Sequence, residues 1–513
     1  MKKTLALIFL FAVSIYSINA QSISKADIEK LDEYYSKMLK DWDVPSFSIG
    51  IVKDGKLVFT GNYGVLDVNN KTKPDENTLY AIASNSKAFT SALTGMLVQE
   101  GKLNWNDKVI DYLPYFSLFD DPWISNEVNI RDILSHRVGL GTFSGDVMWY
   151  KANLTAEDYI KRAGSLPKAF DFRDGYGYSN LMYITAGEIM KVITGKSWGE
   201  IVKERILDPL EMNRTITTFK DLEKMKNYAT PHGRVDEVNT AIEWEDWEEI
   251  GAMGGIISSV NDMAKWMIFN LNHGIHNNDT LLNKQTRNLI WTPHNNFVVD
   301  HTQKDDFGRH FRGYGLGWSL GDYHGNFMVG HTGGFDGMIS AVTMIPEEKL
   351  GIVVLTNGHK SPYMAATYHA LDVFLGMEHK DWSAKLLDRY NNYMQRTSRV
   401  EQIKEKRITG TEPSLDIESY TGTYKSDIYG NIFVSNKNGE LILEFEHSPA
   451  LSAKLKHWHF DVWEIVWDNQ HAWFDFGTLN FLTNNNMNIT GLEFEVPNND
   501  IFFDELKPYK ISD

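Results

Sequence analysis

The segments with strand-like patterning in the first 380 residues lie at its two ends. Phe47–Tyr63 forms two alternating apolar runs joined by Asp54-Gly55, a pair typical of a tight hairpin turn. Much later, Met338–Ile345 and Leu350–Leu355 are separated by a turn at Pro346. Segments far apart in the chain must therefore meet in one antiparallel sheet, with the mainly helical middle packed beside it. The sequence predicts an α+β fold: an antiparallel sheet flanked by helices, with a helical subdomain.

The patterning changes after residue 380, which predicts further domains. Residues 381–415 are charged and helical, and we expect a helical linker there. Residues 416–513 contain short apolar runs with turn signals between them, which favours a small β-barrel. The strands expected in this barrel are Asn431–Ser435, Glu440–Phe445, Val462–Trp467, Ala472–Phe476 and Leu492–Val496. In the first domain, residues 21–380, helices are predicted over Ser24–Lys40 and from Phe89 to Leu97.

The first 20 residues have the layout of a secretory signal peptide. Lys2 and Lys3 precede an apolar run from Leu5 to Tyr16, and small residues ending at Ala20 offer a cleavage site. The run is shorter than the roughly 20 apolar residues that span a bilayer. We therefore expect an exported protein, periplasmic or extracellular, without stable membrane insertion once residues 1–20 are removed.

Charge and cysteine content exclude several classes of function. The chain has 51 Lys and Arg against 68 Asp and Glu, a formal net charge of −17, which opposes binding to nucleic-acid phosphates. It has no cysteine, which excludes disulfides, thiolate catalysis and Cys-type zinc sites. Neither property predicts an oligomeric state.

Ser84 and Lys87 form a Ser-x-x-Lys pair where a helical pattern begins. Residues three apart lie on one face of a helix, so the hydroxyl and the amine can meet. A serine hydroxyl needs a base to become nucleophilic, and lysine can act as one when burial lowers its pKa. A helix-capping serine beside a solvated lysine is the alternative, and the pair alone does not exclude it.

Two further segments carry polar groups at predicted element boundaries. Tyr178-Ser179-Asn180 follows a glycine-rich stretch and precedes a helix; the tyrosine could relay a proton and the asparagine could orient a substrate. His331-Thr332-Gly333-Gly334 precedes the strand at Met338, and its glycines would let a substrate backbone approach. Taken alone, each segment is better explained as a turn or a loop.

The order of these three segments resembles the serine β-lactamase and penicillin-binding protein superfamily, especially its class C β-lactamase, DD-peptidase, D-aminopeptidase and esterase branch. The resemblance covers about Lys25 to Leu375 and includes Ile133–Leu140 and Gly254–Ser259. It implies a β-lactamase/transpeptidase-like serine hydrolase domain over residues 21–380. The C-terminal segment is similar to the lipocalin-like domain attached to some relatives.

The resemblance also implies roles for individual residues. Ser84 would be acylated, with Lys87 and Tyr178 moving protons, and no metal or cofactor would be needed. Substrate would contact Asn180 and the third motif, where His331 stands as a partly charged cation, and the backbone N–H groups of Ser84 and Gly334 would form the oxyanion hole. The full set of expected site residues is Ser84, Lys87, Tyr178, Asn180, His331, Thr332, Gly333 and Gly334.

One departure from the family bears on the substrate. Class C β-lactamases usually carry Lys where this chain has His331, and histidine is only partly charged near neutrality. This favours a peptidase or D-aminopeptidase-like enzyme over an efficient β-lactamase, acting on a small-molecule or peptide substrate. A carboxylesterase or lactonase is the alternative, and a catalytically idle peptide- or cell-wall-binding protein is the alternative from another class.

Two other patterns are given structural interpretations. Gly195-Lys196-Ser197-Trp198-Gly199 matches a nucleophile elbow, but the flanking patterns are helical and Gly195 is predicted to cap a helix. Several acidic and histidine side chains gather at His294–His310 without the spacing of metal ligands, so we expect a surface loop there.

Overall fold

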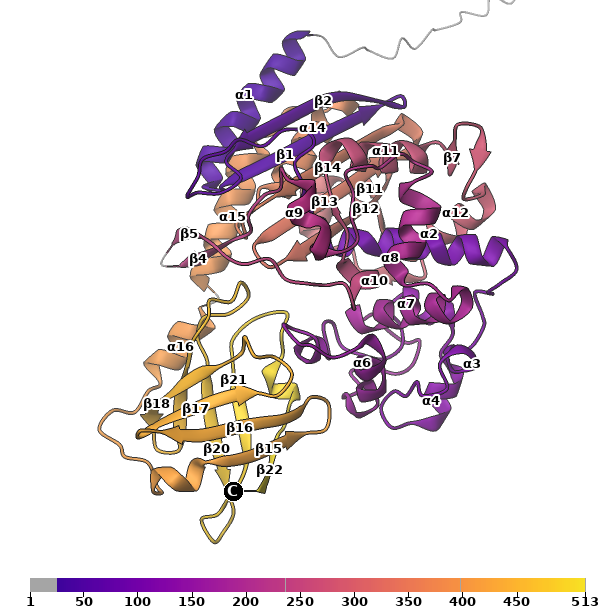
Figure 1. Ribbon diagram of the computed structural model, residues 1–513. Helices are drawn as coiled ribbons and strands as arrows, with labels where there is room; N and C mark the ends of the chain where they lie inside the picture. Colours follow the sequence, from indigo (N-terminus) through magenta and orange to yellow (C-terminus); the bar gives the residue numbers. More distant parts are fainter. Residues whose placement is uncertain (1–24, 236, 397, 513) are drawn as a thin grey trace, which may run out of the picture.

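The computed structural model describes residues 25–235, 237–396 and 398–512, and it is organised around one antiparallel sheet (Figure 1). The expected signal peptide at 1–20 lies outside these residues. The strand order is β2-β1-β14-β13-β12-β11-β10-β9. These strands are β1 (Ser46–Lys53), β2 (Lys56–Gly64), β9 (Asn295–Phe297), β10 (Arg312–Tyr314), β11 (Ser319–Tyr323), β12 (Asn326–Phe335), β13 (Met338–Ile345) and β14 (Leu350–Thr356).

Helices cover both faces of this sheet, because its central strands are apolar on both sides. On one face, α1 (Lys25–Trp42), α14 (Tyr363–Leu375) and α15 (Trp382–Arg396) share a core with β1 and β14. On the other face, α2 (Ser86–Gln99) and α11 (Val260–Leu271) belong to the larger core. Phe89 of α2 stacks on Trp266 of α11 with ring centroids 3.9 Å apart. The α+β fold expected from the sequence is confirmed.

The helical subdomain packs around α2 and α7 (Asn180–Thr194), below the sheet in Figure 1. Its other helices are α3 (Val109–Tyr112), α4 (Pro122–Glu127), α5 (Ile130–Leu134), α6 (Ala156–Arg162), α8 (Trp198–Val202) and α10 (Gly251–Gly254). The remaining elements outside the C-terminal region are α9 (Leu222–Met225), α12 (Lys284–Ile290), α13 (His301–Phe307), β3 (Tyr80–Ala81), β4 (His232–Val235), β5 (Val238–Ala241), β6 (Ile257–Ser258), β7 (Ile275–His276) and β8 (Asp279–Thr280).

Strand prediction succeeded where apolar alternation is regular and missed strands without it, including the ten-residue β12, whose motif is rich in glycine and polar residues. The hairpin of β1 and β2 and the pairing of β13 with β14 are confirmed. The missed strands β9, β10 and β11 are three to five residues long, and their polar residues and glycines give no alternating pattern.

The segment expected to be a linker contains two helices, α15 and α16 (Arg399–Glu405). Trp382, at the start of α15, is fully buried, and its ring lies parallel to Phe307 at 5.4 Å. Its indole N–H donates to the Asp372 carboxylate at 2.6 Å. Residue 382 therefore packs with the sheet domain. No helix within the described residues is long and apolar enough to cross a membrane.

The C-terminal region is a closed barrel of eight consecutive antiparallel strands, as expected (Figure 1). Large apolar side chains, including Tyr424, Phe445 and Phe481, fill its interior. The strands are β15 (Gly422–Ser426), β16 (Gly430–Lys437), β17 (Glu440–Phe445), β18 (Ala453–His459), β19 (Val462–Trp467), β20 (Thr478–Thr483), β21 (Ile489–Glu495) and β22 (Tyr509–Ser512).

The strand predicted at Ala472–Phe476 is wrong. This segment is irregular, and its aromatic side chains have different partners: Phe474 packs on Tyr150 of the first domain, whereas Phe476 packs on Trp458 of the barrel. The Trp473 indole N–H donates to Asp336, in the turn after β12, at 2.6 Å.

Candidate active site

Ser84 lies in a tight turn immediately before the central helix. The turn, Ala83–Asn85, is a 3₁₀ turn that leads into α2 at Ser86. Ala83 has a φ of 45°, in the left-handed region that residues other than glycine seldom adopt. Such strain is typical of positions where the backbone must present a side chain in one orientation. The expected helical spacing is therefore partly replaced by a turn, which still brings Ser84 and Lys87 together.

Lys87 is fully buried and its amine touches the Ser84 hydroxyl. The Nζ–Oγ distance is 3.0 Å. Burial lowers the pKa of Lys87 to about 7, although Asp146 acts in the opposite direction. A substantial share of this amine is therefore neutral near pH 7, the state in which lysine can accept a proton.

The other contacts of Lys87 orient its lone pair. Nζ lies 2.7 Å from Asn180 Oδ1 and 2.7 Å from the Met253 carbonyl oxygen, and both are acceptors. A neutral amine has two N–H groups, which these two acceptors satisfy. Its lone pair is then left for the hydroxyl hydrogen of Ser84. The geometry is that of a base poised on its nucleophile.

Asp146, which sequence reasoning missed, fixes the orientation of Asn180. Its Oδ2 accepts from Asn180 Nδ2 at 2.6 Å, so that the amide oxygen of Asn180 must face Lys87. The Trp149 indole N–H donates to Asp146 Oδ1 at 2.9 Å. Burial raises the pKa of Asp146, and these two donors counteract that rise. A lone aspartate in a loop gives no sequence signal for this role.

Tyr178 lies across the site from Lys87. Lys87 Nζ is 4.9 Å from the centre of the Tyr178 ring. The phenol oxygen is buried and makes no hydrogen bond of acceptable geometry among the described residues. Burial raises the pKa of Tyr178 well above its usual value, and the nearby Ser84 hydroxyl offsets part of the rise. The phenol therefore keeps its proton at neutral pH, and it can donate to a group that arrives with the substrate.

His331 is neutral, which differs from the partly charged cation expected from the sequence. Burial, the largest effect, and then the charge of Lys87 lower its pKa to about 3. Its Nδ1 lies 2.5 Å from the Thr332 carbonyl oxygen, an acceptor, and therefore carries the hydrogen. Its Nε2, 3.0 Å from the Tyr314 hydroxyl, then accepts. Both ring nitrogens make hydrogen bonds, so the ring supports its neighbours and carries no positive charge.

The strand that carries the third motif is open on one side beside Ser84. β12 pairs with β11 only up to Gly330, whereas it pairs with β13 up to Phe335. A side chain at Gly333 would lie 2.9 Å from the Ser84 backbone nitrogen and 2.2 Å from the Ile82 carbonyl oxygen. Only glycine allows the strand to approach the nucleophile this closely. Together with Ser84 and Thr332, Gly333 and Gly334 line one cavity of about 440 Å³.

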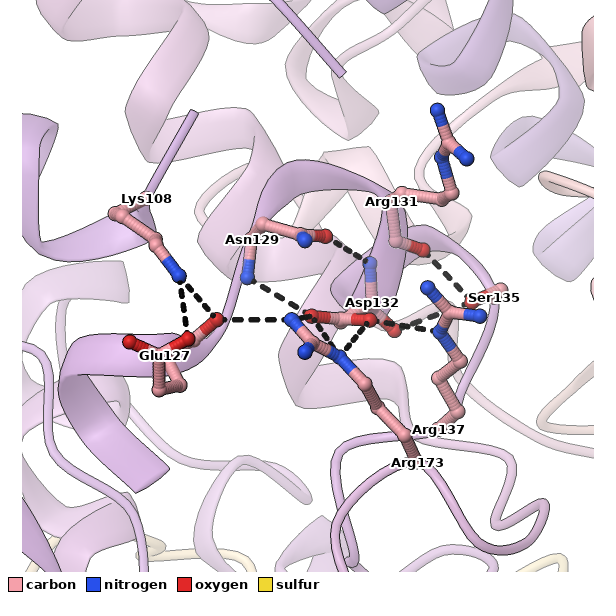
Figure 2. Close-up of polar contacts among 8 residues, drawn as sticks. All are labelled: Lys108, Glu127, Asn129, Arg131, Asp132, Ser135, Arg137 and Arg173. Carbon is pink, nitrogen blue, oxygen red and sulfur yellow. Dashed lines mark hydrogen bonds and ion pairs between the residues drawn. The ribbon is translucent and has the colours of Figure 1, made fainter. Parts of the chain in front are cut away.

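A buried carboxylate at Asp132 joins two loops through Arg137 and Arg173 (Figure 2). In the sequence, His136 lies on the first loop and Tyr178 on the second. Arg137 Nε and Arg173 Nη2 each donate to the Asp132 carboxylate at 2.7 Å. The backbone of the second loop is tied to the first by a hydrogen bond from Ser179 N–H to His136 Nδ1 at 3.0 Å. This network places Tyr178 by fixing the segments on both sides of it.

The expected site residues all lie at or next to this cavity, with Lys87 buried directly beneath it. The structure also tests the two patterns that were interpreted as structural, at Gly195 and at His294–His310. Gly195 ends α7 with a φ of 72°, which confirms the predicted helix cap. The surface loop expected at His294–His310 is wrong: this segment contains β9 and helix α13, and Asp306 of α13 pairs with Lys385 and Arg389. Within the described residues, no group of three or more such side chains could hold a metal.

A serine beside a buried lysine, a facing tyrosine and an open glycine-bearing strand, on this α+β fold, are the features of the β-lactamase and penicillin-binding protein superfamily, whose members are generally serine hydrolases. The family model described as Beta-lactamase matches residues 31–374. The chain therefore belongs to the β-lactamase family. A second model, a domain of unknown function (DUF3471), matches residues 406–508, the region of the barrel.

Individual relatives span most of the chain. It is 29% identical over 441 residues to an unguisins hydrolase, ungD, of Aspergillus violaceofuscus, covering 76% of this chain and 74% of that protein. It is 28% identical over 386 residues to protein flp of Staphylococcus aureus, covering 71% and 70%. An octameric penicillin-binding protein homologue from Pyrococcus abyssi shares the fold, with a TM-score of 0.62 and 22% identity over 92% of this chain and 98% of its own.

Proposed function

We propose that this protein is an exported hydrolase that cleaves amide bonds in peptides or related small molecules through an acyl-enzyme on Ser84. The observation that carries the proposal is the contact of Lys87 Nζ with Ser84 Oγ at 3.0 Å, made by an amine whose pKa burial lowers to about 7. A buried amine in this state is the activating base that a serine nucleophile needs.

The proposed reaction follows from these contacts. Lys87 removes the hydroxyl proton as Ser84 Oγ attacks the substrate carbonyl carbon. The backbone N–H groups of Ser84 and Gly334 stabilise the oxyanion that forms. The protonated Lys87 returns its proton through the Tyr178 hydroxyl to the leaving nitrogen, and the amide bond breaks. Water then releases the acyl group from Ser84 by the same proton path in reverse.

The argument against β-lactam substrates rests on the electrostatics around Ser84. A neutral His331 offers no positive charge for the carboxylate that β-lactams carry. The cavity is lined by two aspartates, and among the described residues no lysine or arginine lines it. One relative is named a hydrolase of unguisins, which is consistent with hydrolytic chemistry on this scaffold. The signal-like residues 1–20 support a site of action in the periplasm or outside the cell.

The test is covalent labelling of Ser84. A fluorophosphonate probe should label the wild-type protein with one equivalent, and Ser84→Ala should abolish labelling. Ser86→Ala is the matched control, because the Ser86 hydroxyl is buried, accepts from the Ile256 N–H at 3.1 Å and does not line the cavity. It should label like the wild type.

Equal labelling of wild type and Ser84→Ala would reject the mechanism. Absence of labelling in both proteins would favour an idle binding protein on this fold. A panel of short acyl esters, amino-acid amides, D-Ala-D-Ala peptides and a chromogenic cephalosporin then separates the substrate classes. Faster Ser84-dependent turnover of the esters would identify a carboxylesterase or lactonase instead.

A further inference from the structure

The C-terminal barrel supplies part of the wall of the active-site cavity. Trp473, Asp500 and Ile501 line it together with Ser84. Trp473 is fixed to the first domain by its hydrogen bond to Asp336, and the terminal ring carbon of its indole would touch a side chain added at Gly334 at 3.0 Å. These residues are therefore positioned to contact a bound substrate.

Asp500 is a half-buried carboxylate in this cavity without a compensating partner. Among the described residues, no hydrogen bond or ion pair to its side-chain oxygens is present. The backbone of its turn is fixed instead: the N–H groups of Asp500 and Ile501 both donate to Asn498 Oδ1, at 2.9 and 2.6 Å. Burial raises the pKa of Asp500 to about 6. A carboxylate that is partly withdrawn from water and has no partner loses solvation free energy, which a cation bound beside it would recover.

The surroundings of Asp500 suit an organic cation. Asp146 lies in the same cavity, and the two carboxylates influence each other, since Asp500 contributes to the raised pKa of Asp146. Three tryptophans, Trp149, Trp247 and Trp473, line the same space. Aromatic faces attract alkylammonium groups through their negative ring faces. Negative charge with an aromatic wall is a pattern for binding an amine.

We propose that Asp500 binds a positively charged primary amino group of the substrate, so that the preferred substrates are amides or peptides carrying such an amine. The inference rests on the function proposed above and specifies its substrate class. Either a free amino terminus or the side-chain amine of a lysine-like residue could supply the ammonium group. The experiment distinguishes these two sources.

The experiment compares three amides: alanine p-nitroanilide, its N-acetyl derivative, and Nα-acetyl-lysine p-nitroanilide, each in D and L forms. Each amide is assayed as substrate and as competitor that slows fluorophosphonate labelling of Ser84. The second readout works for compounds that bind without being cleaved. Wild type should favour an amine-bearing amide over the acetylated one by about tenfold or more, chiefly in KM or in the inhibition constant.

The variant Asp500→Asn should lose this preference while its labelling rate and its response to the N-acetyl amide stay at wild-type values. Asp475→Asn, which makes the same change at an exposed aspartate outside the cavity, should keep the preference. Preference for the alanine amide identifies an amino terminus as the ligand, and preference for the lysine derivative identifies a side-chain amine.

The inference is overturned by no preference for amines in the wild type, or by the same preference in Asp500→Asn. In both cases Ser84-dependent labelling would persist, so the proposed function would stand. Loss of labelling in Asp500→Asn would show that the carboxylate supports the nucleophile rather than an amine, which also overturns the inference. Failure of the proposed function itself is observed separately, as equal labelling of the wild type and Ser84→Ala.

Discussion

Two walls enclose Ser84, and they come from different domains. The wall from the β-lactamase-family domain carries Ser84, Tyr178 and Gly334, with Lys87 beneath it, and each of these lies in a short motif at the end of a helix or strand. The wall from the barrel carries Trp473 and Asp500, which lie in irregular segments between strands. In the proposed function the first wall supplies the groups that break the bond, whereas the second supplies groups that contact the substrate.

This difference separates chemistry from recognition. Proton transfer demands atoms within hydrogen-bond distance, which a turn and the adjoining helix provide for Ser84 and Lys87. Recognition tolerates looser placement, so it can be assigned to a domain whose position depends on docking. The predictions below test whether this division holds, starting with the base.

Replacing Lys87 should have the largest effect, because it removes a group on the chemical wall. Lys87→Ala should lower the rate of acylation at saturating probe by roughly 10²–10⁴-fold, the usual contribution of a general base. Pre-steady-state labelling follows the same step as phosphonylation of Ser84 by the fluorophosphonate, which needs the same activation of the hydroxyl. A loss of less than about tenfold would point to Tyr178 as the base. The first domain would still supply the base, but the base would be Tyr178 and not Lys87.

The pH dependence of acylation should reflect the titration of the Lys87 amine, with a smaller effect on the rate than the substitution has. Lys87 is active when neutral, so the rate should rise with pH, level off above about 7, and fall about tenfold per pH unit below it. At pH 5 this is about a 100-fold loss from the plateau. A probe without an amine excludes the contribution of Asp500, whose pKa is about 6.

Tyr178→Phe provides the control for that assignment. The phenol keeps its proton throughout this range, because burial raises its pKa well above the usual value. The variant should slow the reaction but leave the midpoint of the profile near 7. If the midpoint of the pH profile shifts in Tyr178→Phe, the fall in rate at low pH does not come from the titration of Lys87 alone.

Local patterns predicted much of the fold and of the chemical wall. The Asp54-Gly55 hairpin and the strand pair β13–β14 were predictable because alternation and turn residues are short-range signals. Ser84 and Lys87 were predictable for the same reason, since a spacing of three residues fixes their proximity before any tertiary contact is known.

The features that the sequence did not predict depend on long-range packing. Asp146 meets Asn180 only after two loops fold together, and the Met253 carbonyl that contacts Lys87 is a backbone atom which any residue could supply. The charge of His331 depends on burial, which the motif does not encode. The predicted strand at Ala472–Phe476 has apolar patterning, but domain docking gives that segment a different role.

The smallest expected effect probes a contact between the barrel and the loop that precedes Asp146. Glu505 of the barrel accepts from Ser144 Oγ at 2.6 Å and from Gly145 N–H at 2.7 Å, immediately before Asp146. Glu505→Ala should release this loop and lower the acylation rate roughly fivefold, through a less firmly held Asn180. Glu505→Gln should retain most activity, because its amide oxygen can still accept from one of the two donors.

A purely structural role for Glu505 would leave the midpoint of the acylation pH profile in place, whereas a positioning role should shift it, because Asp146 acts on the pKa of Lys87. Asp504→Ala, at the exposed neighbouring residue, is the matched control and should change neither rate nor midpoint. If Glu505→Ala also leaves both unchanged, the barrel acts on substrate recognition alone and the two walls are independent. If both change, docking of the barrel tunes the base, and the separation of chemistry from recognition is only partial.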